Sequence, residues 1–435
     1  MKAGSSAPVK PALAVEDLVQ RLYRAVFFEP LGEDARRFFR SLGWTAVFFT
    51  LAKGMTAAAS VVGARLLGPE QYGLANLAVS AGGLLSSVML LGMHASIVRF
   101  GVGEGSARGL PTGLAAAVVS LAVLGAAFWF SRAPFAAALH LPADVYRWAW
   151  IYAALFSPAL VVFSTQQALG LFRSRGWAEL AGAASVALGL GLGWLLFGPR
   201  FEALAVAYAL PGAAVALVWG APLLSRVHLR LFDPKRLRDI MSFGMYNLGT
   251  GIGFFLTTQS QRFVLNAYLD PRQVGLYSAY AVATLGLAAY AGAVFSTVFF
   301  PKAAASTNRA RLWQALASAW AWAGLPMVAV FTVLGWLALL LMGRSAYPVE
   351  PATLLLFAGA SAVMAAQNSF GQIVGAEGVR GARLGVIMSI TMGVVSLALT
   401  LTLVPLWAVR GAVAAVALTY AFGLGWLWVV RQRYF

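Results

Sequence analysis

The stretch RLLGPEQYGL, residues 65–74, decides the fold of this chain because it occurs twice. It returns about 200 residues later as AYLDPRQVGL, residues 267–276, with leucine, proline, glutamine, glycine and leucine at matching positions. Further matches keep this spacing: Ser41 with Ser242, Gly43 with Gly244, Gln166 with Gln367, and Gly170 with Gly371. The chain is therefore predicted to consist of two related halves.

The composition indicates that both halves lie in a membrane. Of 435 residues, 60% are hydrophobic and 11% are charged, whereas soluble domains have roughly 45–50% and about 25%. Apolar runs of about 20 residues predict membrane-spanning helices. Twelve are expected, at 42–66, 72–96, 110–131, 148–170, 177–197, 201–224, 241–266, 275–300, 312–342, 350–374, 381–404 and 410–430. The predicted fold class is an all-α polytopic membrane protein with six helices in each half.

The formal net charge of +17 is better explained by membrane topology than by nucleic-acid binding. Most of the 32 Lys and Arg residues fall on the side of the N-terminus when the spans are threaded through a bilayer. Basic residues accumulate in cytoplasmic loops of membrane proteins. Both termini are therefore predicted to be cytoplasmic, in a multi-pass protein of a bacterial inner membrane.

The same assignment of spans and loops to the bilayer predicts four regions. Two lobes, residues 41–224 and 241–431, are joined by a basic cytoplasmic linker at residues 225–240. The cytoplasmic segment 1–40 lacks the continuous apolar run of a signal peptide. Its apolar residues recur at i, i+3, i+4 and i+7, as in an amphipathic helix, which either lies on the inner leaflet or docks a partner.

Several chemistries are disfavoured. The chain has no cysteine and only three scattered histidines, so no metal site and no cofactor is expected. The glycine-rich GVGEGSARG lacks the lysine of a nucleotide-binding phosphate loop. The predicted outer loops are short, which disfavours an enzyme. Duplicated helical bundles are instead common in transporters, whose binding site lies between the halves.

Lys53 is the clearest candidate for that site because it lies near the middle of the first predicted span. A charge at that depth costs at least ~2.5–3.5 kcal/mol on insertion scales, so it is a functional candidate by default. Thr50, Thr56 and Ser60 share its helix face. We expect this polar stripe to face a water-filled cavity, although Lys53 could also reach the bilayer surface through its long side chain.

The seventh span carries a second polar stripe in the run TTQSQR, residues 257–262. Asn247, Thr250, Thr258, Gln261 and Arg262 share one arc of the helix. The repeat spacing maps Gln261 onto Ser60, so the stripes occupy the same face of equivalent helices. The two helices are predicted to face each other across one central cavity.

Other readings of these residues stay open. Arg262 lies near the outer end of its span and could reach the surface, and Arg99 could serve as an inner anchor or meet an anionic group. The paired amides Gln166 and Gln367 are expected to bond neighbouring helices. No Asp or Glu lies deep in a predicted span, which favours an anionic substrate over a cationic one. The predicted substrate-binding residues are Lys53, Ser60, Arg99, Asn247, Thr258, Gln261 and Arg262.

Residues 65–100 also resemble a known family. The turn with Arg65, Gly68, Pro69 and Gly73, followed by a helix that ends in a glycine and Arg99, is similar to polysaccharide and oligosaccharide-lipid flippases. These belong to the multidrug/oligosaccharidyl-lipid/polysaccharide (MOP) exporter superfamily. The resemblance extends over about residues 41–430.

The resemblance implies a V-shaped, MATE-like flippase that works by alternating access. It would move an undecaprenyl-pyrophosphate-linked oligosaccharide, a polysaccharide repeat unit, to the outer leaflet, with the diphosphate on Lys53, Arg262 and Arg99. Implied partners are this lipid-linked oligosaccharide, membrane lipids, and a polysaccharide polymerase and glycosyltransferases, without nucleic acid. Gln261 stands where many relatives have an acid, which weakens ion coupling there. The alternatives are a cation-coupled multidrug antiporter and a non-transporting scaffold.

Overall fold

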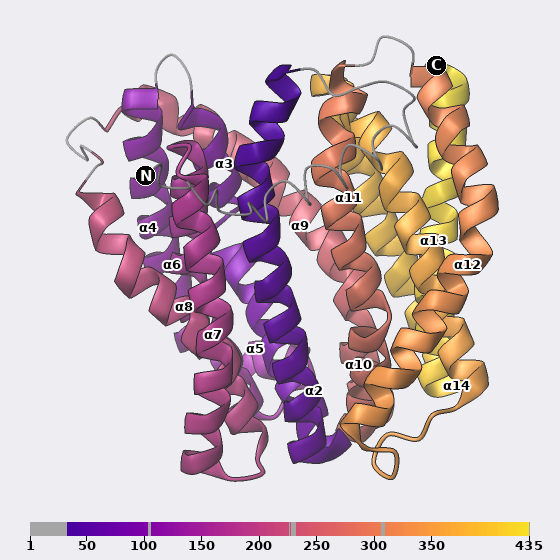
Figure 1. Cartoon of the computed structure of the whole chain (residues 1–435). Coiled ribbons are helices and arrows are strands. Elements are labelled where there is room, and N and C mark those ends of the chain that lie inside the picture. Colours follow the sequence, from indigo (N-terminus) through magenta and orange to yellow (C-terminus); the bar gives the residue numbers. More distant parts are fainter. Residues whose placement is uncertain (1–32, 103–105, 226, 228–231, 306–308, 435) are drawn as a thin grey trace, which may run out of the picture.

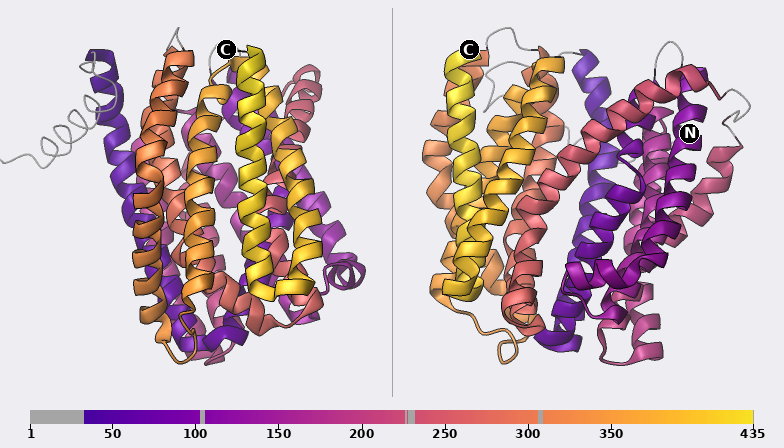
Figure 2. Two further views of the ribbon diagram at one scale, coloured as in Figure 1. Left: turned by 90° about the vertical axis from the view of Figure 1, so that its right-hand side faces the viewer. Right: turned by 180° about the vertical axis from the view of Figure 1, so that it is seen from behind.

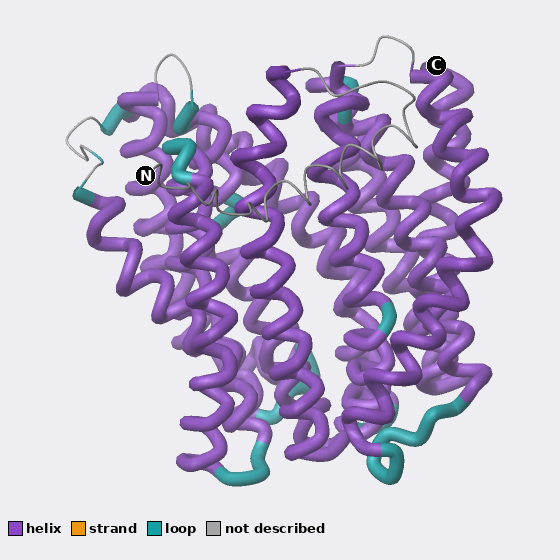
Figure 3. Tube along the Cα trace, in the orientation of Figure 1, coloured by secondary structure: helices purple, strands orange, loops and turns teal. Residues whose placement is uncertain are grey.

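The computed structural model describes residues 33–102, 106–225, 227, 232–305 and 309–434. All regular secondary structure in these ranges is helical (Figure 3). The first half contains α2 Glu33–Met89, α3 Met93–Phe100, α4 Ser106–Phe130, α5 Arg132–Ala138, α6 Ala143–Ala168, α7 Phe172–Phe197 and α8 Phe201–Leu224. The second contains α9 Pro234–Tyr268, α10 Pro271–Ala283, α11 Leu285–Ala305, α12 Arg309–Gly343, α13 Pro351–Gly375 and α14 Gly378–Tyr434. The predicted amphipathic segment lies almost wholly outside the described residues.

The described helices account for the twelve expected crossings. In the part of the chain that the structure covers, nine stretches are long and apolar enough to span a membrane. Two of them, 47–89 and 380–432, are each long enough for two crossings and are interrupted by a kink. The polar helix α9 supplies the remaining crossing. The predicted all-α polytopic fold is confirmed.

A glycine allows the chain to reverse direction at the kink inside α2. Gly68 has φ 71° and ψ 170°, a conformation open to glycine but strained for other residues. Pro69 follows and starts the second crossing, since its fixed φ suits the first turn of a helix. Gly68 and Pro69 in the first copy of the repeat therefore turn the chain between two crossings.

The two halves stand side by side, and α9 connects them. In Figure 1, α2 to α8 lie on the left and α10 to α14 on the right. The right-hand view of Figure 2 shows α9 running obliquely from one half to the other. It begins at Pro234, inside the predicted linker, because the Asp233 carboxylate accepts a hydrogen bond from the Lys235 backbone N–H at 3.0 Å and caps the helix.

Helix α9 is attached to both halves. Near its start, the Ser96 hydroxyl of α3 donates to the Ile240 carbonyl at 2.9 Å. Further along, Gly253 approaches the backbone of Ser389 in α14 so closely that a Cβ there would lie 2.4 Å from the Ser389 oxygen. Helix α9 therefore closes one side of the space between the halves.

The two copies of the repeat contact each other at the lower end of the molecule in Figure 1. A Cβ added at Gly73 would lie 1.9 Å from the Pro271 carbonyl oxygen, and one added at Gly275 would lie 1.7 Å from the Pro69 oxygen. The contact is reciprocal, as expected for two related halves. Only glycine permits backbones to approach this closely.

Side chains reinforce this closure. The Tyr347 hydroxyl, from the loop between α12 and α13, donates to the Ala64 carbonyl of α2 at 3.0 Å. Burial raises the pKa of Tyr347 above its usual range, so the hydroxyl stays protonated. The Tyr72 and Tyr347 rings meet edge to face at 6.3 Å, and the Asn266 amide donates to the His140 carbonyl at 2.7 Å. Contacts between the halves thus close the lower end.

Replacing Gly275 with alanine is expected to weaken this closure by about 1–3 kcal/mol, since the added methyl group overlaps backbone that cannot move aside. The chain has no native cysteine, so a single Val79→Cys reporter in α2 can be labelled cleanly. Labelling by an impermeant thiol reagent from the lower side should rise several-fold.

The matched control is Gly371→Ala in α13, where an added Cβ meets nothing within 4 Å. Its labelling should equal that of the parent. Equal labelling in Gly275→Ala as well would contradict the assignment of this contact as the lower closure.

Candidate functional site

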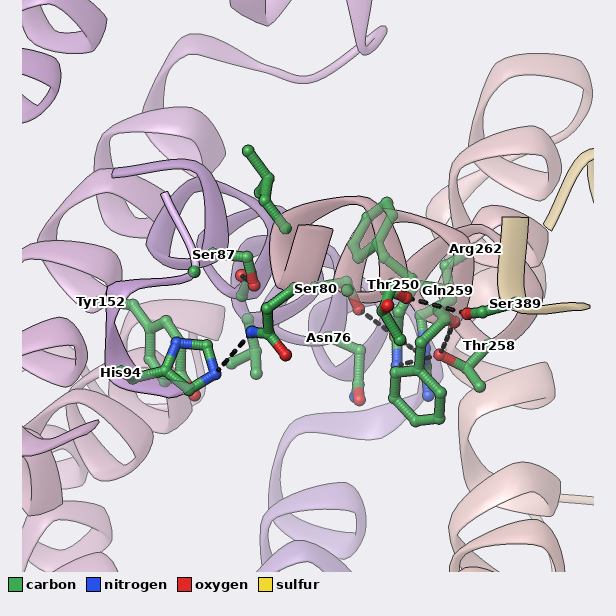
Figure 4. Close-up of a pocket in the computed structure, with 18 residues that line it drawn as sticks. Asn76, Ser80, Ser87, His94, Tyr152, Thr250, Thr258, Gln259, Arg262 and Ser389 are labelled. Atoms are coloured by element: carbon green, nitrogen blue, oxygen red, sulfur yellow. Dashed lines mark hydrogen bonds between the residues drawn. The ribbon is translucent and has the colours of Figure 1, made fainter. Parts of the chain in front are cut away.

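A polar cavity lies between the two halves above the closed lower end (Figure 4). This central cavity has a volume of about 620 Å³ and is formed by the second crossing of α2 with α3, α6, α9 and α14. Its polar lining consists of Asn76, Ser80, Ser87, His94, Tyr152, Asn247, Thr250, Thr258, Gln259, Arg262 and Ser389. Amides and hydroxyls dominate, and no carboxylate is among the described residues that line it.

Arg262 is held firmly in the wall of this cavity. Its Nε donates to the Ser278 hydroxyl at 3.0 Å, its Nη1 donates to the Gln259 side-chain oxygen, and its guanidinium lies 5.8 Å from the Tyr277 ring centre. The residue is only 9% exposed. Gln259 also accepts a hydrogen bond from Ser80 of α2 at 2.8 Å. Arg262 therefore belongs to a polar chain that joins the halves.

A second cavity of about 740 Å³, here called the vestibule, adjoins the first at His94. It is lined by Lys53, His94, Ala95, Val98, Arg99, Phe156, Leu160, Phe163, Ser164, Gln167, Arg175, Glu179 and Phe243. The first crossing of α2 and the helices α3, α6, α7 and α9 contribute these residues. Three cations and one carboxylate make it the more positive of the two spaces.

His94 marks the boundary between the cavities. Its Nε2 lies 3.4 Å from the Asn247 amide nitrogen, and its Nδ1 is buried without a hydrogen-bond partner. The chain places it there by breaking the second crossing: Leu91 and Gly92 have φ values of 47° and 69° before α3 begins. Irregular backbone at membrane depth is tolerated where it lines a cavity.

The structure brings five of the seven predicted site residues to these spaces. Asn247, Thr258 and Arg262 line the central cavity, and Lys53 and Arg99 line the vestibule. The expected pairing of Lys53 with Arg262 in one cavity is not observed, because each lines a different space.

Ser60 and Gln261 are instead buried within their own halves. The Ser60 hydroxyl is 2.8 Å from the Tyr72 hydroxyl, and the Gln261 amide donates to Ser396 of α14 at 3.1 Å. Neither is among the described residues that line the central cavity or the vestibule. Ser60 and Gln261, which the repeat spacing aligns, are both buried. Each side chain points into its own helical bundle and not toward the space between the halves.

Several lining residues were not among the predicted site residues. Asn76 and Ser80 lie one turn apart on α2, and with Ser87 they form a polar face that helical periodicity could have revealed. Gln259 lay in the polar run but was not singled out. Arg175, near the end of a predicted span, served only as one of the basic residues that indicate the cytoplasmic side of the membrane.

In the described ranges, no group of three or more His, Cys, Asp or Glu side chains is arranged to hold a metal ion. Apart from Glu179 in the vestibule, the polar groups of both cavities are mainly hydroxyls, amides and cations. Such an arrangement binds and positions a polar, anionic molecule.

Two helical halves with a cavity between them are an arrangement that is common among membrane transporters. The sequence profile of a family described as polysaccharide biosynthesis protein matches residues 38–307. This match spans more than half of the chain, which therefore belongs to that family. No curated protein matches the chain at a significant level.

Solved transporters share the fold. A multidrug resistance transporter of the MATE family, captured facing inward, is 17% identical with a TM-score of 0.59 over 90% of this chain and 96% of that one. A MOP transporter from Pyrococcus furiosus, described as having a binding pocket of reverse polarity, is 17% identical with a TM-score of 0.60 over 91% and 95%. A MATE transporter bound to MaD3S is 14% identical with a TM-score of 0.57 over 90% and 97%. The predicted MATE-like fold is confirmed.

The bond between Ser60 and Tyr72 gives a test of a structural role for Ser60. Ser60→Ala and Tyr72→Phe should each lower the free energy of unfolding in detergent by about 0.5–1.5 kcal/mol, because each removes the same buried hydrogen bond. The double variant should lose less than the sum of the two. Additive losses measured by denaturant unfolding would contradict this bond.

Proposed function

We propose that this protein is a flippase that moves a lipid-linked oligosaccharide, an undecaprenyl-pyrophosphate-linked repeat unit, from the inner to the outer leaflet. Family membership supports a role in polysaccharide biosynthesis. The fold supports transport by alternating access between two rocking halves. Exopolysaccharide assembly is the expected pathway, with a polymerase and glycosyltransferases as partners.

One observation carries the proposal: the polar side chains that line the central cavity are mainly amides and hydroxyls, with no carboxylate among its described lining residues. Sugar hydroxyls both donate and accept hydrogen bonds, and these side chains match them. Diphosphate oxygens only accept, and cations with N–H groups match those. The adjoining vestibule supplies such cations: Lys53, Arg99 and Arg175.

The proposed orientation rests on the distribution of Lys and Arg, which favours the side of the two termini as cytoplasmic. Helix α2 begins and α14 ends at the upper end in Figure 1, which we place in the cytoplasm of a bacterial cell with the inner membrane around the helices. The closed lower end then faces outward, so this conformation receives substrate from inside. Transport requires no covalent step, and the protein acts without enzymatic chemistry.

A cation-coupled multidrug antiporter is the second candidate, and it is favoured by the MATE transporters of the same fold. Cationic drugs are best held by carboxylates, and the described lining of the central cavity lacks them. Purified protein in liposomes separates the candidates. A flippase exposes a labelled polyprenyl-pyrophosphate saccharide to an external probe faster than protein-free vesicles, whereas an antiporter expels a cationic dye along an imposed proton or sodium gradient.

Exposure of the saccharide at the protein-free rate, with dye efflux present, would reject the flippase in favour of the antiporter. Absence of both activities, in protein that elutes as a single folded species, would reject transport by this chain.

Filling the central cavity should block flipping. Gly83 lines it, and an added Cβ there meets nothing within 4 Å, so Gly83→Leu projects into the cavity without disturbing the helix packing. We expect the flipping rate to fall at least tenfold. Gly324→Leu in α12, where an added Cβ also meets nothing within 4 Å, should keep the parental rate. Similar rates in the two variants would place the substrate path elsewhere.

A further inference from the structure

We propose that the anionic head of the substrate is bound in the vestibule by Lys53, Arg99 and Arg175, with Arg262 acting only as a structural cation of the central cavity. This inference rests on the proposed function and deepens it. Its new elements are the assignment of Arg175 on α7 as a phosphate ligand and the separation of the phosphate site from the glycan site.

The three vestibule cations have no carboxylate partner. None of them forms an ion pair with a described Asp or Glu, although Glu179 lines the same space. Each lies against an aromatic ring instead: Lys53 is 5.0 Å from the Phe49 centre. Uncompensated cations around one cavity favour an anion there.

Arg99 and Arg175 are held in the same manner. The Arg99 guanidinium lies 4.9 Å from the Phe243 ring centre, and that of Arg175 lies 5.8 Å from the Phe163 centre. Contact with an aromatic face restrains a guanidinium while leaving its in-plane N–H groups available. The rings therefore position the cations without consuming their hydrogen-bonding capacity.

Arg175 is positioned by α6. Its Nη1 donates to the side-chain oxygen of Gln167, one helical turn beyond Phe163. Phe163 and Gln167 thus fix an arginine that the neighbouring helix supplies. The three cations and Glu179 leave a formal charge of +2 (three minus one) on the lining, which suits a diphosphate diester with one negative charge on each phosphate.

Arg262 also lies over an aromatic ring, but it is more fully bonded and buried. Its Nε and Nη1 already donate to Ser278 and Gln259, and it is 9% exposed. A phosphate there would compete with these two bonds, and Gln259 is also the side chain that Ser80 of the other half contacts. With the diphosphate in the vestibule, the attached sugar extends past His94 into the amide-lined central cavity, which gives each cavity the ligand that its chemistry matches.

A phosphate ligand could be the head of a lipid-linked glycan or that of an ordinary membrane phospholipid. The vestibule and the central cavity share the lining residue His94, and this proximity favours the glycan carrier, because a phospholipid has no glycan to bind the amides and hydroxyls of the central cavity. The two sources are separated experimentally by the choice of probe and bilayer.

The test uses the full chain in phosphatidylcholine nanodiscs, titrated with farnesyl pyrophosphate by isothermal calorimetry. Arg175→Gln should weaken binding roughly tenfold or more, the usual result of losing a charge-assisted hydrogen bond. Lys53→Gln and Arg99→Gln should act in the same direction. The control is Arg132→Gln, because Arg132 is also an exposed cation on an aromatic ring, 5.2 Å from Trp129, but lines neither cavity. Its affinity should be unchanged.

Binding by Arg175→Gln within twofold of the parent, in protein that elutes as one folded species, would overturn the proposal. So would a loss in folded Arg262→Gln as large as that in Arg175→Gln. Replacing a third of the lipid with phosphatidylglycerol should reduce farnesyl pyrophosphate affinity less than threefold; a tenfold reduction would assign the vestibule to bulk lipid headgroups and overturn the proposal.

The calorimetric measurement of farnesyl pyrophosphate binding does not depend on transport. Arg175-dependent binding in a protein that flips nothing in liposomes would therefore reject the proposed function and leave the phosphate site standing. Flipping that proceeds at the parental rate in Lys53→Gln and Arg175→Gln would overturn the phosphate site and leave the flippase standing.

Discussion

The close backbone contact between the two copies of the repeat is the constraint on which the rest of the structure depends. Gly73 and Gly275 each approach the carbonyl of the opposite proline, Pro271 or Pro69, at distances that no side chain permits. This contact brings the halves together at one end of the molecule and sets the space between them at membrane depth. The cavities exist because the halves meet at this point and are joined elsewhere by the oblique helix α9.

Polar groups inside this frame fall into two kinds, which differ in their partners. Arg262 is buried and bonded to Ser278 and Gln259, as an embedded charge must be if it stabilises packing. In the open vestibule, Arg175 donates one side-chain hydrogen bond, to Gln167, and Lys53 lies over the Phe49 ring. In the proposed assignment Arg262 stabilises packing whereas Arg175 binds substrate, and the two differ in how fully the protein buries and bonds each guanidinium.

Much of the fold was predictable, because the bilayer restricts the backbone to helices long enough to cross it. The twelve crossings and their duplication follow from apolar length and from the repeat. Boundaries were less certain: α9 begins inside the predicted linker because Asp233 and Pro234 start a helix there. The polar run in α9 indicated a cavity-lining helix and contains Thr258 and Arg262, and Asn247 lies earlier on the same helix; all three line the central cavity.

The sequence alone determined the helical class, the two related halves, the polar faces of the first and seventh crossings and the scarcity of embedded acids. Only the tertiary structure decided that Ser60 and Gln261 are buried in their own bundles, that Lys53 and Arg262 line separate cavities, and that Arg175 joins Lys53. The reason is geometric. Periodicity gives the angles between side chains on one helix, whereas the rotation of that helix against its neighbours is set by packing with residues distant in the chain.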